Sequence, residues 1–566
     1  MICGACGLIL LAAGAGRAGE AACVTNRVAV PAGGSHTGGA FTYTRALRGQ
    51  NGGHAVYELR YPSPVVTPHA ANNTVPAELY LPEGLTGKGP FPAVVCLHIL
   101  HGNFDLERML CTRLARSGVI ALFFKQPFYG ERGGKEGRRL ALAQAPIFIQ
   151  GLEQGLEDAR RAVDILQAMP EVNPGRIGIT GISMGAIQAA SVCGREPRVT
   201  KAFLTLGGGD LRSILLQARE TRAMRAFIQG LPEAEQERVW ACVDRIDPLN
   251  AKEALRRLAA AGKLRMVCAE RDEVVPPACA RKLADAAGCA DRITWLAGLG
   301  HYTAMAAFPR ILGDISAFFG EDAPPDWTPP GENGEGTPTA LLARFLAGLA
   351  TLLGSDPLEQ TAHLAGGEAE VTQDGKTFTC SFDFARGTQG RFRLQGEFPV
   401  VGQAGLGYGS CPWLIGGGKT VFCGTRDAGD GRPLSARLAP QGLLRYRVAV
   451  GALTAAALAP EALGQYYTLR EEPAGKAGRR IRLILDYRKA KGFLTLTFAA
   501  QALPTEIEWD FGKARGRLRL THWRVNAVAD DALFEAPAGL PRREVRQEDL
   551  LRMFVSAAEF GLEAME

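Results

Sequence analysis

The sequence lacks the features that mark membrane-spanning, nucleic-acid-binding and disulfide-stabilised proteins. Its only long apolar run without charge, Met1 to Gly16, is shorter than the roughly 20 residues that a spanning helix needs. Basic and acidic residues number 64 and 58, and the net charge of +6 over 566 residues is too dilute for a nucleic-acid footprint. The 13 cysteines are odd in number and irregular in spacing, unlike a disulfide scaffold.

What the sequence contains is the composition of a folded protein. Hydrophobic residues make up 46% and charged residues 22%, which are ordinary globular values despite 69 glycines. At 566 residues the chain exceeds what one hydrophobic core holds, so we expect two or three domains. Cys96 and Cys268 lie inside apolar strand-like runs and are interpreted as core residues.

The N-terminus resembles a targeting segment. Leu8 to Ala13 is apolar and is followed by small residues through Ala22, which predicts a secretory signal peptide over residues 1–22 and an exported protein, periplasmic or extracellular. No Lys or Arg precedes the apolar stretch, so an Ala/Gly-rich N-terminus without a targeting role is the alternative.

A Pro/Gly-rich acidic segment, Glu321 to Pro338, divides the chain and predicts a linker. Before it, over residues 23–320, apolar runs alternate with helical patterns, which predicts an α/β domain with a mostly parallel sheet flanked by helices. The expected strands are Ala93–Leu97, Val119–Phe124, Arg176–Thr180, Lys201–Leu206, Arg265–Ala269 and Arg292–Leu296, and the clearest helices are Gly155–Met169 and Cys279–Ala287.

The region after the linker, residues 339–566, has a different pattern. A helix is expected at Thr339 to Leu353, and a final amphipathic helix at Glu548 to Ala564. Between them, runs that alternate with a period of two predict a separate, mainly antiparallel β domain with few helices. These runs are Thr377–Phe384, Leu444–Val450, Arg480–Tyr487, Gly492–Phe498, Glu506–Phe511 and Leu518–Val525.

The strongest functional signal is the pentapeptide Gly181 to Gly185, which contains Ser183. It directly follows the strand-like run Ile177 to Thr180 and precedes the small-residue helical run Ala186 to Ser191. This is the setting of a nucleophile elbow, in which a serine occupies a strained turn and a Cβ at either flanking position would collide with its neighbours. The alternative is a Gly-rich turn with a structural serine.

A serine nucleophile needs a base and an acid, which follow it in the order Ser, Asp, His. Between Ser183 and the linker the sequence has a single histidine, His301, which we take as the base. Asp272 follows a buried-looking strand and is our candidate acid, because parallel sheets gather catalytic groups at the carboxyl ends of their strands. Glu270 and Glu273 are its local competitors.

The tetrahedral oxyanion needs two backbone N–H donors. One is the residue after the nucleophile, Met184. The other is expected in the turn after the early strand that ends at Leu97, and we favour the amide of Ile99 or Leu100.

Two histidines near this turn, His98 and His101, have a spacing that invites a metal-site interpretation. No cysteine or carboxylate cluster accompanies them, so we expect no metal and no organic cofactor. Asp105 and Glu107 are interpreted as charges at a helix N-terminus.

Residues from about Tyr57 to Phe319 resemble the α/β-hydrolase superfamily, in particular its dienelactone-hydrolase, acetyl-xylan-esterase and prolyl-oligopeptidase-like branches. The resemblance is carried by Glu157–Asp164 with Val172–Gly185, by Asp272–Pro276 and by Gly300–His301. It implies the roles of nucleophile for Ser183, acid for Asp272 and base for His301. The chain departs from the pattern where His98-Ile99-Leu100-His101-Gly102 replaces the usual His-Gly, and in having serine where dienelactone hydrolases have cysteine.

Two further segments bear on specificity. Charged helices expected at Leu211 to Gly230 and Glu233 to Val243 form an insertion, about residues 207–262, where an α/β-hydrolase places its lid. Leu518 to Asn526 with Asp530 to Pro537 resembles the closing strands of LolA-like lipoprotein-carrier proteins, a resemblance that covers about residues 339–544. It implies a curved antiparallel sheet whose apolar face holds acyl chains or packs against its own helices. The alternative is an interaction or stabilising domain that binds no ligand.

Together these features predict a serine hydrolase, a carboxylic-ester hydrolase with an acyl-enzyme intermediate, acting on a small-molecule, carbohydrate or lipid ester. One alternative is a non-catalytic envelope protein that binds a lipid or lipoprotein on a hydrolase scaffold. A prolyl-oligopeptidase-like peptidase is another, although no large N-terminal propeller precedes the catalytic region. No nucleic-acid partner is expected.

Overall fold

The computed structural model places most of the chain in two compact units, residues 17–333 and a second unit that contains residues 334–566. The residues that it describes are 23–28, 39–51, 53–85, 89–100, 104–324, 337–353, 361–373, 375–388, 391–398, 402–416, 419–425, 450, 453–454, 456–457, 467–474, 478–487, 490–499, 503–512, 514–527, 530–546 and 549–550. Each unit has a sheet of its own and is described separately.

The first unit is built on a ten-stranded sheet of the order β1-β2-β3-β4-β6-β5-β7-β8-β9-β10. Strands β1 to β4 are antiparallel to their neighbours, and the series from β6 through β10 is parallel. The strands are β1 Cys23–Val28, β2 Phe41–Asn51, β3 His54–Pro62, β4 Thr74–Pro82, β5 Phe91–Leu97, β6 Ile120–Phe124, β7 Val172–Ile182, β8 Val199–Thr205, β9 Leu264–Ala269 and β10 Thr294–Leu296.

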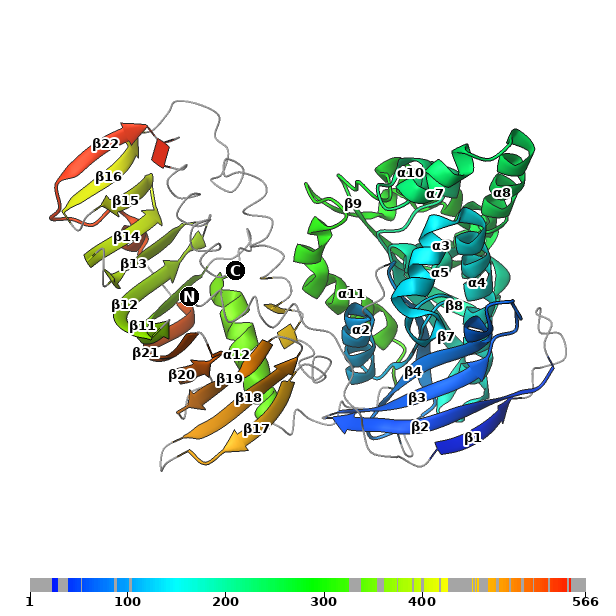
Figure 1. Cartoon of the computed structure of the whole chain (residues 1–566), viewed down its shortest axis with the longest axis horizontal. Coiled ribbons are helices and arrows are strands. Elements are labelled where there is room, and N and C mark those ends of the chain that lie inside the picture. The colour runs from blue at the N-terminus through cyan, green and yellow to red at the C-terminus, as the bar shows by residue number, and fades with distance from the viewer. Residues whose placement is uncertain are drawn as a thin grey trace. The chain divides into compact units, whose positions relative to one another are not determined.

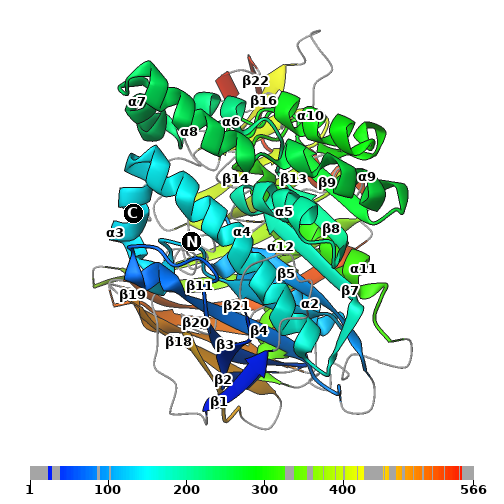
Figure 2. The same ribbon diagram turned by 90° about the vertical axis from the view of Figure 1, so that its right-hand side faces the viewer.

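Helices cover both faces of this sheet. Helices α2 and α11 contact each other and lie on one face, over β4, β5 and β6, whereas α4, α5 and α9 pack on the other, over β5, β7, β8 and β9 (Figure 1). Figure 2 shows α4 and α5 crossing in front of the central strands. The α-helices are α2 Asp105–Arg116, α3 Gly134–Ala143, α4 Ala145–Ala168, α5 Met184–Arg195, α6 Leu211–Gln217, α7 Arg222–Gln229, α8 Glu233–Arg245, α9 Lys252–Ala260, α10 Pro277–Ala287 and α11 Phe308–Gly320, and the short 3₁₀ turns are η1 Ala70–Asn73, η2 Gly130–Arg132, η3 Pro248–Ala251, η4 Ala290–Arg292 and η5 Thr303–Ala307.

Burial explains why the central strands are continuous apolar runs. All residues of β5 and of β6 are buried, because helices cover the sheet on both sides. Cys96 in β5 and Cys268 in β9 are buried with them, and burial raises the pKa of the Cys268 thiol to about 12. The predicted α/β class of the first unit and all six predicted strands are confirmed.

The predicted insertion, about residues 207–262, contains four described α-helices, α6 to α9, where the sequence indicated two. Helix α6 ends at Gln217 and α7 begins at Arg222, because Thr221 turns its hydroxyl back onto the carbonyls of Leu215 (2.7 Å) and Ala218 (3.0 Å). Figure 2 shows α6, α7 and α8 together at one end of the unit.

The start of the predicted linker belongs to the first unit. The ammonium of Lys201 lies 3.3 Å from a carboxylate oxygen of Glu321 and 3.0 Å from one of Asp322, and Arg176 donates to the Asp322 carbonyl at 2.6 Å. Residues 325–336 of the predicted linker lie outside the described residues.

The second unit is a twelve-stranded sheet of the order β17-β18-β19-β20-β21-β11-β12-β13-β14-β15-β16-β22, in which only the pair β16 and β22 is parallel among the described strands. Its elements are α12 Pro338–Leu353, β11 Ala362–Gln373, β12 Lys376–Arg386, β13 Phe392–Phe398, β14 Gly402–Tyr408, β15 Pro412–Gly416, β16 Thr420–Thr425, β17 Tyr467–Glu472, β18 Arg479–Tyr487, β19 Ala490–Phe498, β20 Pro504–Asp510, β21 Ala514–Ala527, η8 Asp531–Phe534 and β22 Arg542–Arg546. The predicted separate, mainly antiparallel β domain with few helices is confirmed.

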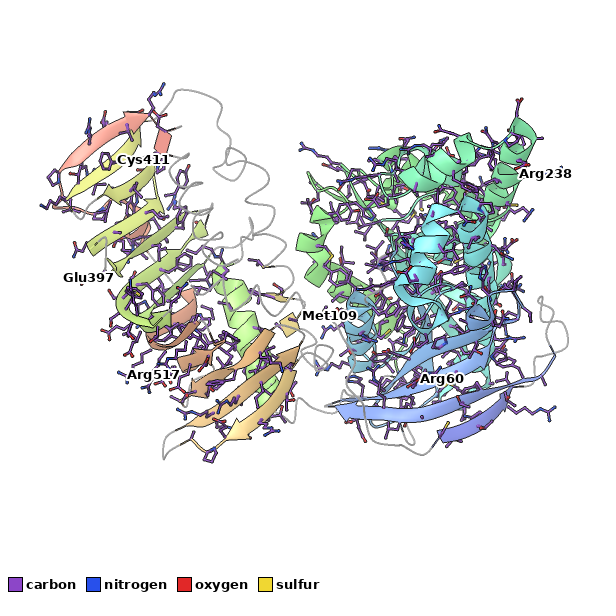
Figure 3. All side chains as sticks on the ribbon, viewed as in Figure 1. Arg60, Met109, Arg238, Glu397, Cys411 and Arg517 are labelled. Carbon is purple, nitrogen blue, oxygen red and sulfur yellow. The ribbon has the colours of Figure 1, made fainter. Side chains whose placement is uncertain are left out.

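The two faces of the second sheet differ in character. One face is charged: Arg517 of β21 (Figure 3) donates to Glu506 of β20 at 2.8 Å. On its other side Arg517 is the register partner of Glu370 in β11. The other face is apolar: Ile507 and Leu518 are register partners and are buried. Helix α12 packs over β11, β17, β18 and β21, with the ring of Phe345 edge-on to Trp523.

Three predictions fall outside the described residues: the signal peptide over residues 1–22, most of the strand at Leu444 to Val450, and most of the helix at Glu548 to Ala564. Of the helices that the structure describes, none has the length and apolar character to cross a bilayer.

Candidate active site

The candidate residues meet at one edge of the first sheet. Strands β5, β7, β9 and β10 belong to its parallel series, so their carboxyl ends lie on the same side. Ser183 follows β7, Asp272 follows β9 and His301 follows β10, while Ile99 and Leu100 follow β5.

Ser183 occupies the sharp turn between β7 and α5. Its φ of 55° lies in the left-handed region, and its N–H donates to the carbonyl of Thr205 at the end of β8 (2.8 Å). A non-glycine residue adopts this backbone at a cost of about 1 kcal/mol or more, so the surrounding contacts must hold it there.

Both glycines that flank the turn are required by close packing. A Cβ on Gly181 would lie 2.8 Å from the backbone nitrogen of Ala186 and nearer still to Gly185. A Cβ on Gly185 would lie 2.6 Å from the carbonyl carbon of Leu97. The predicted collision at both positions is therefore present, with the helix at the first and with the end of β5 at the second.

Ser183, His301 and Asp272 form a continuous hydrogen-bonded series. The Ser183 Oγ lies 2.8 Å from Nε2 of His301, and Nδ1 of His301 lies 2.8 Å and 3.0 Å from the two carboxylate oxygens of Asp272. A carboxylate only accepts, so Nδ1 carries the proton and Nε2 is left to accept from the serine hydroxyl. The imidazole is thereby held in the tautomer that a general base for serine requires.

Asp272 is itself fixed by the chain around it. It is 8% exposed, and its Oδ1 accepts the N–H groups of Val274 (2.9 Å) and Val275 (2.7 Å). These bonds stabilise the carboxylate and direct its other oxygen at the imidazole.

The two competing acids bind the backbone of the histidine loop. Glu273 accepts the N–H of His301 at 2.8 Å, and Glu270 accepts the N–H of Gly298 at 2.8 Å. The structure thus brings Asp272, and neither of the glutamates, to the imidazole. The positioning role of Glu273 was not predicted, because sequence spacing does not show where the backbone of a loop passes.

The candidate oxyanion donors differ in whether their backbone N–H groups already make a hydrogen bond. The N–H of Ile99 donates to Oε1 of Glu107 at 3.0 Å, so this amide is already engaged. No hydrogen bond to another described residue is found for the N–H of Met184 or of Leu100. Of the two loop amides favoured from the sequence, Leu100 remains the candidate.

Glu107 departs from its interpretation as a charge at a helix N-terminus. It lies in the first turn of α2 but is 1% exposed, and burial raises the pKa of its carboxyl to about 7. A signal was present in the sequence: Glu107 precedes the buried residues Leu110, Cys111 and Leu114 by three, four and seven positions, which is the spacing of one helix face.

Both ring nitrogens of His98 are occupied by the protein. Nε2 accepts the N–H of Gln126 at 3.0 Å, so the proton is on Nδ1, which donates to the carbonyl of Ile99 at 2.7 Å. The ring is fully buried, and this burial lowers the pKa of His98 to about 4, so it is neutral near pH 7. Within the described residues no three His, Cys, Asp or Glu side chains gather as a metal site requires.

The insertion contacts the loop that carries His301. The hydroxyl of Tyr302, the residue after His301, donates to the carboxylate of Glu220, which lies between α6 and α7. Tyr302 is 44% exposed. The insertion is therefore tied to the loop that carries the histidine.

Comparison with known proteins finds similarity to a hydrolase family in the first unit. Residues 75–226 match the dienelactone hydrolase family, a span that contains Ser183 and ends before Asp272 and His301. This match confirms the α/β-hydrolase resemblance of the first unit. An uncharacterized protein of Pseudomonas aeruginosa (PA2218) is 29% identical over 147 residues, 25% of this chain and 35% of that protein, so the match spans about a third of the relative's length.

Solved structures similar to the chain include two acetyl xylan esterases and that same Pseudomonas protein. The esterase of Paenibacillus sp. R4 is 17% identical, with 48% of this chain and 88% of that chain covered and a TM-score of 0.36. Acetyl xylan esterase 1 of Thermoanaerobacterium sp. is 19% identical, with 49% and 87% covered and a TM-score of 0.36. The Pseudomonas structure is 19% identical, with 44% and 89% covered and a TM-score of 0.31.

Proposed function

We propose that the first unit, a hydrolase domain by its family match, is a serine carboxylic-ester hydrolase with Ser183, His301 and Asp272 as its catalytic residues. The observation that carries the proposal is the series of hydrogen bonds from Ser183 Oγ through the imidazole of His301 to Asp272, each at 2.8 Å. A serine, a histidine and a buried aspartate without a catalytic role have no reason to adopt this tautomer and order beside a strained turn.

The acylation step uses these groups in turn. His301 Nε2 takes the hydroxyl proton of Ser183 as Oγ bonds to the ester carbonyl carbon, and the carbonyl electron pair moves onto oxygen. The N–H groups of Met184 and Leu100 are the proposed donors to this oxyanion. Collapse of the intermediate breaks the bond to the alcohol oxygen, which leaves with the proton from His301.

The acyl-enzyme is then hydrolysed by the same groups. His301 takes a proton from water, the water oxygen adds to the acyl carbon, and the carboxylic acid departs as the proton returns to Ser183 Oγ. Asp272 stabilises the imidazolium in both steps. Each step balances with ester and water alone, so the proposal invokes no metal or organic cofactor.

The substrate class that we propose is a small-molecule, carbohydrate or lipid ester. We also propose that the protein is exported. Two alternatives from the sequence are weighed against it. A non-catalytic lipid- or lipoprotein-binding protein would not need the tautomer that Asp272 imposes on His301. A peptidase would use the same three groups, so the experiment below compares peptides with esters.

The experiment is to measure hydrolysis of chromogenic short-acyl esters and labelling by a fluorophosphonate probe. We expect wild-type protein to turn over the esters and to be labelled at Ser183. The Ser183→Ala variant should lose about 10⁴- to 10⁶-fold in kcat and all labelling. Ser117→Ala, which removes a half-buried hydroxyl bonded to the Arg113 carbonyl, is the matched control and should keep both.

Peptidyl substrates and a series of esters with longer acyl chains belong in the same assay. Near-normal turnover by Ser183→Ala, or a wild-type protein that the probe does not label, would contradict the proposal. A rate on peptides that exceeds the rate on esters would favour the peptidase.

A further inference from the structure

The peptide on each side of Ile99 is held by a buried side chain. The Ile99 N–H donates to Oε1 of Glu107 (3.0 Å), and the Ile99 carbonyl accepts from Nδ1 of His98 (2.7 Å). Glu107 is 1% exposed and His98 is fully buried, so the side-chain end of each bond is removed from bulk water.

The second of these bonds fixes the direction of the Leu100 amide. The Ile99 carbonyl and the Leu100 N–H belong to one trans peptide unit and therefore point in opposite directions. When His98 holds the carbonyl on the buried side, the N–H of Leu100 faces away from it. His98 is rigid in turn, because the N–H of Gln126 binds its other nitrogen and the ring packs against Phe104 and Tyr129.

The same loop lies against the nucleophile turn. Added to Gly185, a Cβ would lie 2.6 Å from the carbonyl carbon of Leu97 and 3.0 Å from the carbonyl oxygen of His98. The segment that leads into Ile99 and Leu100 thus packs directly on the residue after Met184. The two N–H groups that the reaction needs come from chain segments in contact.

Among the described residues, the N–H of Ile99 is the hydrogen-bond donor from another residue that the Glu107 carboxyl is found to have. Its Oε2 is buried and has no hydrogen-bond partner among the described residues. The neighbouring cation, Arg108, turns to Glu78, whose carboxylate it contacts at 2.8 Å and 3.1 Å. Burying a carboxyl group costs free energy unless the group is hydrogen-bonded, and the bond from the Ile99 N–H is the one that this structure shows.

We propose that Glu107 is a positioning residue of the esterase reaction: by holding the Ile99 amide it keeps that N–H out of the site and, with His98, presents the next amide, Leu100, as the loop's oxyanion donor. The proposal rests on the proposed function of Ser183. It resolves the choice between Ile99 and Leu100 that the sequence left open.

The first test compares Glu107→Leu, which removes the acceptor at similar volume, with Glu107→Gln, which keeps an acceptor oxygen for the Ile99 N–H. We expect Glu107→Leu to lose tenfold or more in kcat with KM changed by less than about threefold, since the lost contact acts on the transition state. Glu107→Gln should stay within about threefold of wild type. Asp105→Asn, on the same turn of α2, is the matched control and should leave both constants unchanged.

A second readout separates positioning from a general loss of structure. A short-acyl trifluoromethyl ketone forms a hemiketal with Ser183 whose oxygen occupies the oxyanion position. Its inhibition constant should rise in Glu107→Leu by the same factor as kcat/KM falls, and should not rise in Glu107→Gln. Unchanged kcat and inhibitor affinity in a folded Glu107→Leu would overturn the proposal.

A backbone substitution keeps the proposal testable if Glu107→Leu does not fold. Replacing Leu100 by the corresponding α-hydroxy acid removes only its N–H, and should lower kcat by about 10²- to 10³-fold, as for removal of one oxyanion donor. The same replacement at Ile99 removes the bond to Glu107 and should match the smaller effect of Glu107→Leu. If the ester at residue 100 has no effect on kcat while Ser183 is still labelled, the assignment of the Leu100 N–H as oxyanion donor is wrong. Absence of labelling in the wild type would instead refute the proposed function.

Discussion

At the scale of single residues, the buried carboxyl of Glu107 makes the free energy of unfolding depend on pH. Burial raises the pKa of its carboxyl from about 4.5 to about 7, the Ile99 N–H lowers it, and the charges of Asp105 and Arg108 act in opposite directions. The folded protein therefore holds this proton at pH values where the unfolded chain has lost it. Stability falls as the pH rises from about 4.5 to about 7, and above that window the whole cost of ionising the buried carboxyl is present.

Glu107→Gln removes this titration while it keeps the acceptor oxygen. We expect the variant to be more stable than wild type at pH 8, by up to about 3 kcal/mol, since one pKa unit corresponds to about 1.4 kcal/mol. The difference should shrink towards zero near pH 4.5. Urea unfolding midpoints of both proteins at pH 5 and pH 8 provide the measurement, and a difference that does not depend on pH would contradict the assigned pKa.

The acids after β9 show what residue-level inference from the sequence achieves. His301 could be selected because it has no rival histidine between Ser183 and the linker, and Asp272 because it follows a strand of the parallel series. Which of three neighbouring acids faces the imidazole depends on the turn at Val274 and Val275, whose N–H groups orient Asp272. The order of the charged residues in the sequence does not show how this turn orients their side chains.

At the scale of elements, the strand-turn-helix unit of β7 and α5 depends on the absence of two side chains. We expect Gly185→Ala to lower kcat at least 100-fold and to destabilise the fold by about 1–3 kcal/mol, because the new methyl group would displace the end of β5 and with it the loop of Leu100. Gly313→Ala is the matched control: a Cβ there meets nothing within 4 Å inside α11, so it should be neutral or slightly stabilising. Activity and thermal unfolding of both variants decide the matter, and a fully active Gly185→Ala would show that the contact with Leu97 is dispensable.

The elements that the sequence predicted are those with one dominant pattern. The central strands are apolar throughout because both faces are covered, and the long strands of the second sheet alternate because one face is charged. Strand β14 was missed, since its glycines are typical of loops. The structure gives the reason for one of them: a Cβ on Gly407 would meet the ring of Trp413 and lie 2.9 Å from the carbonyl of Phe392.

At the scale of the whole molecule, the three proposed catalytic residues all lie in the first unit, so we expect this unit to work alone. A chain that ends at Pro324 retains the pairs of Glu321 and Asp322 with Lys201 and should keep kcat/KM on small soluble esters within about threefold of the full chain. Any role of the second unit should appear only with lipidic or envelope-bound substrates, where a second binding site raises the effective concentration. Assays of both chains on both substrate kinds test this, and a folded but inactive short chain would mean that the second unit contributes to the site.

The pairing of Lys201 with Glu321 and Asp322 also bears on when the first unit can fold during translation. Those two acids are the last residues that the first unit uses among those described, and roughly 240 residues of the sequence follow them. At about 5–20 residues per second, translation of that remainder takes on the order of ten seconds or more. Because domains generally fold as units, with the N-terminal one first, we expect the first unit to close its sheet and bring His301 to Ser183 without waiting for the second.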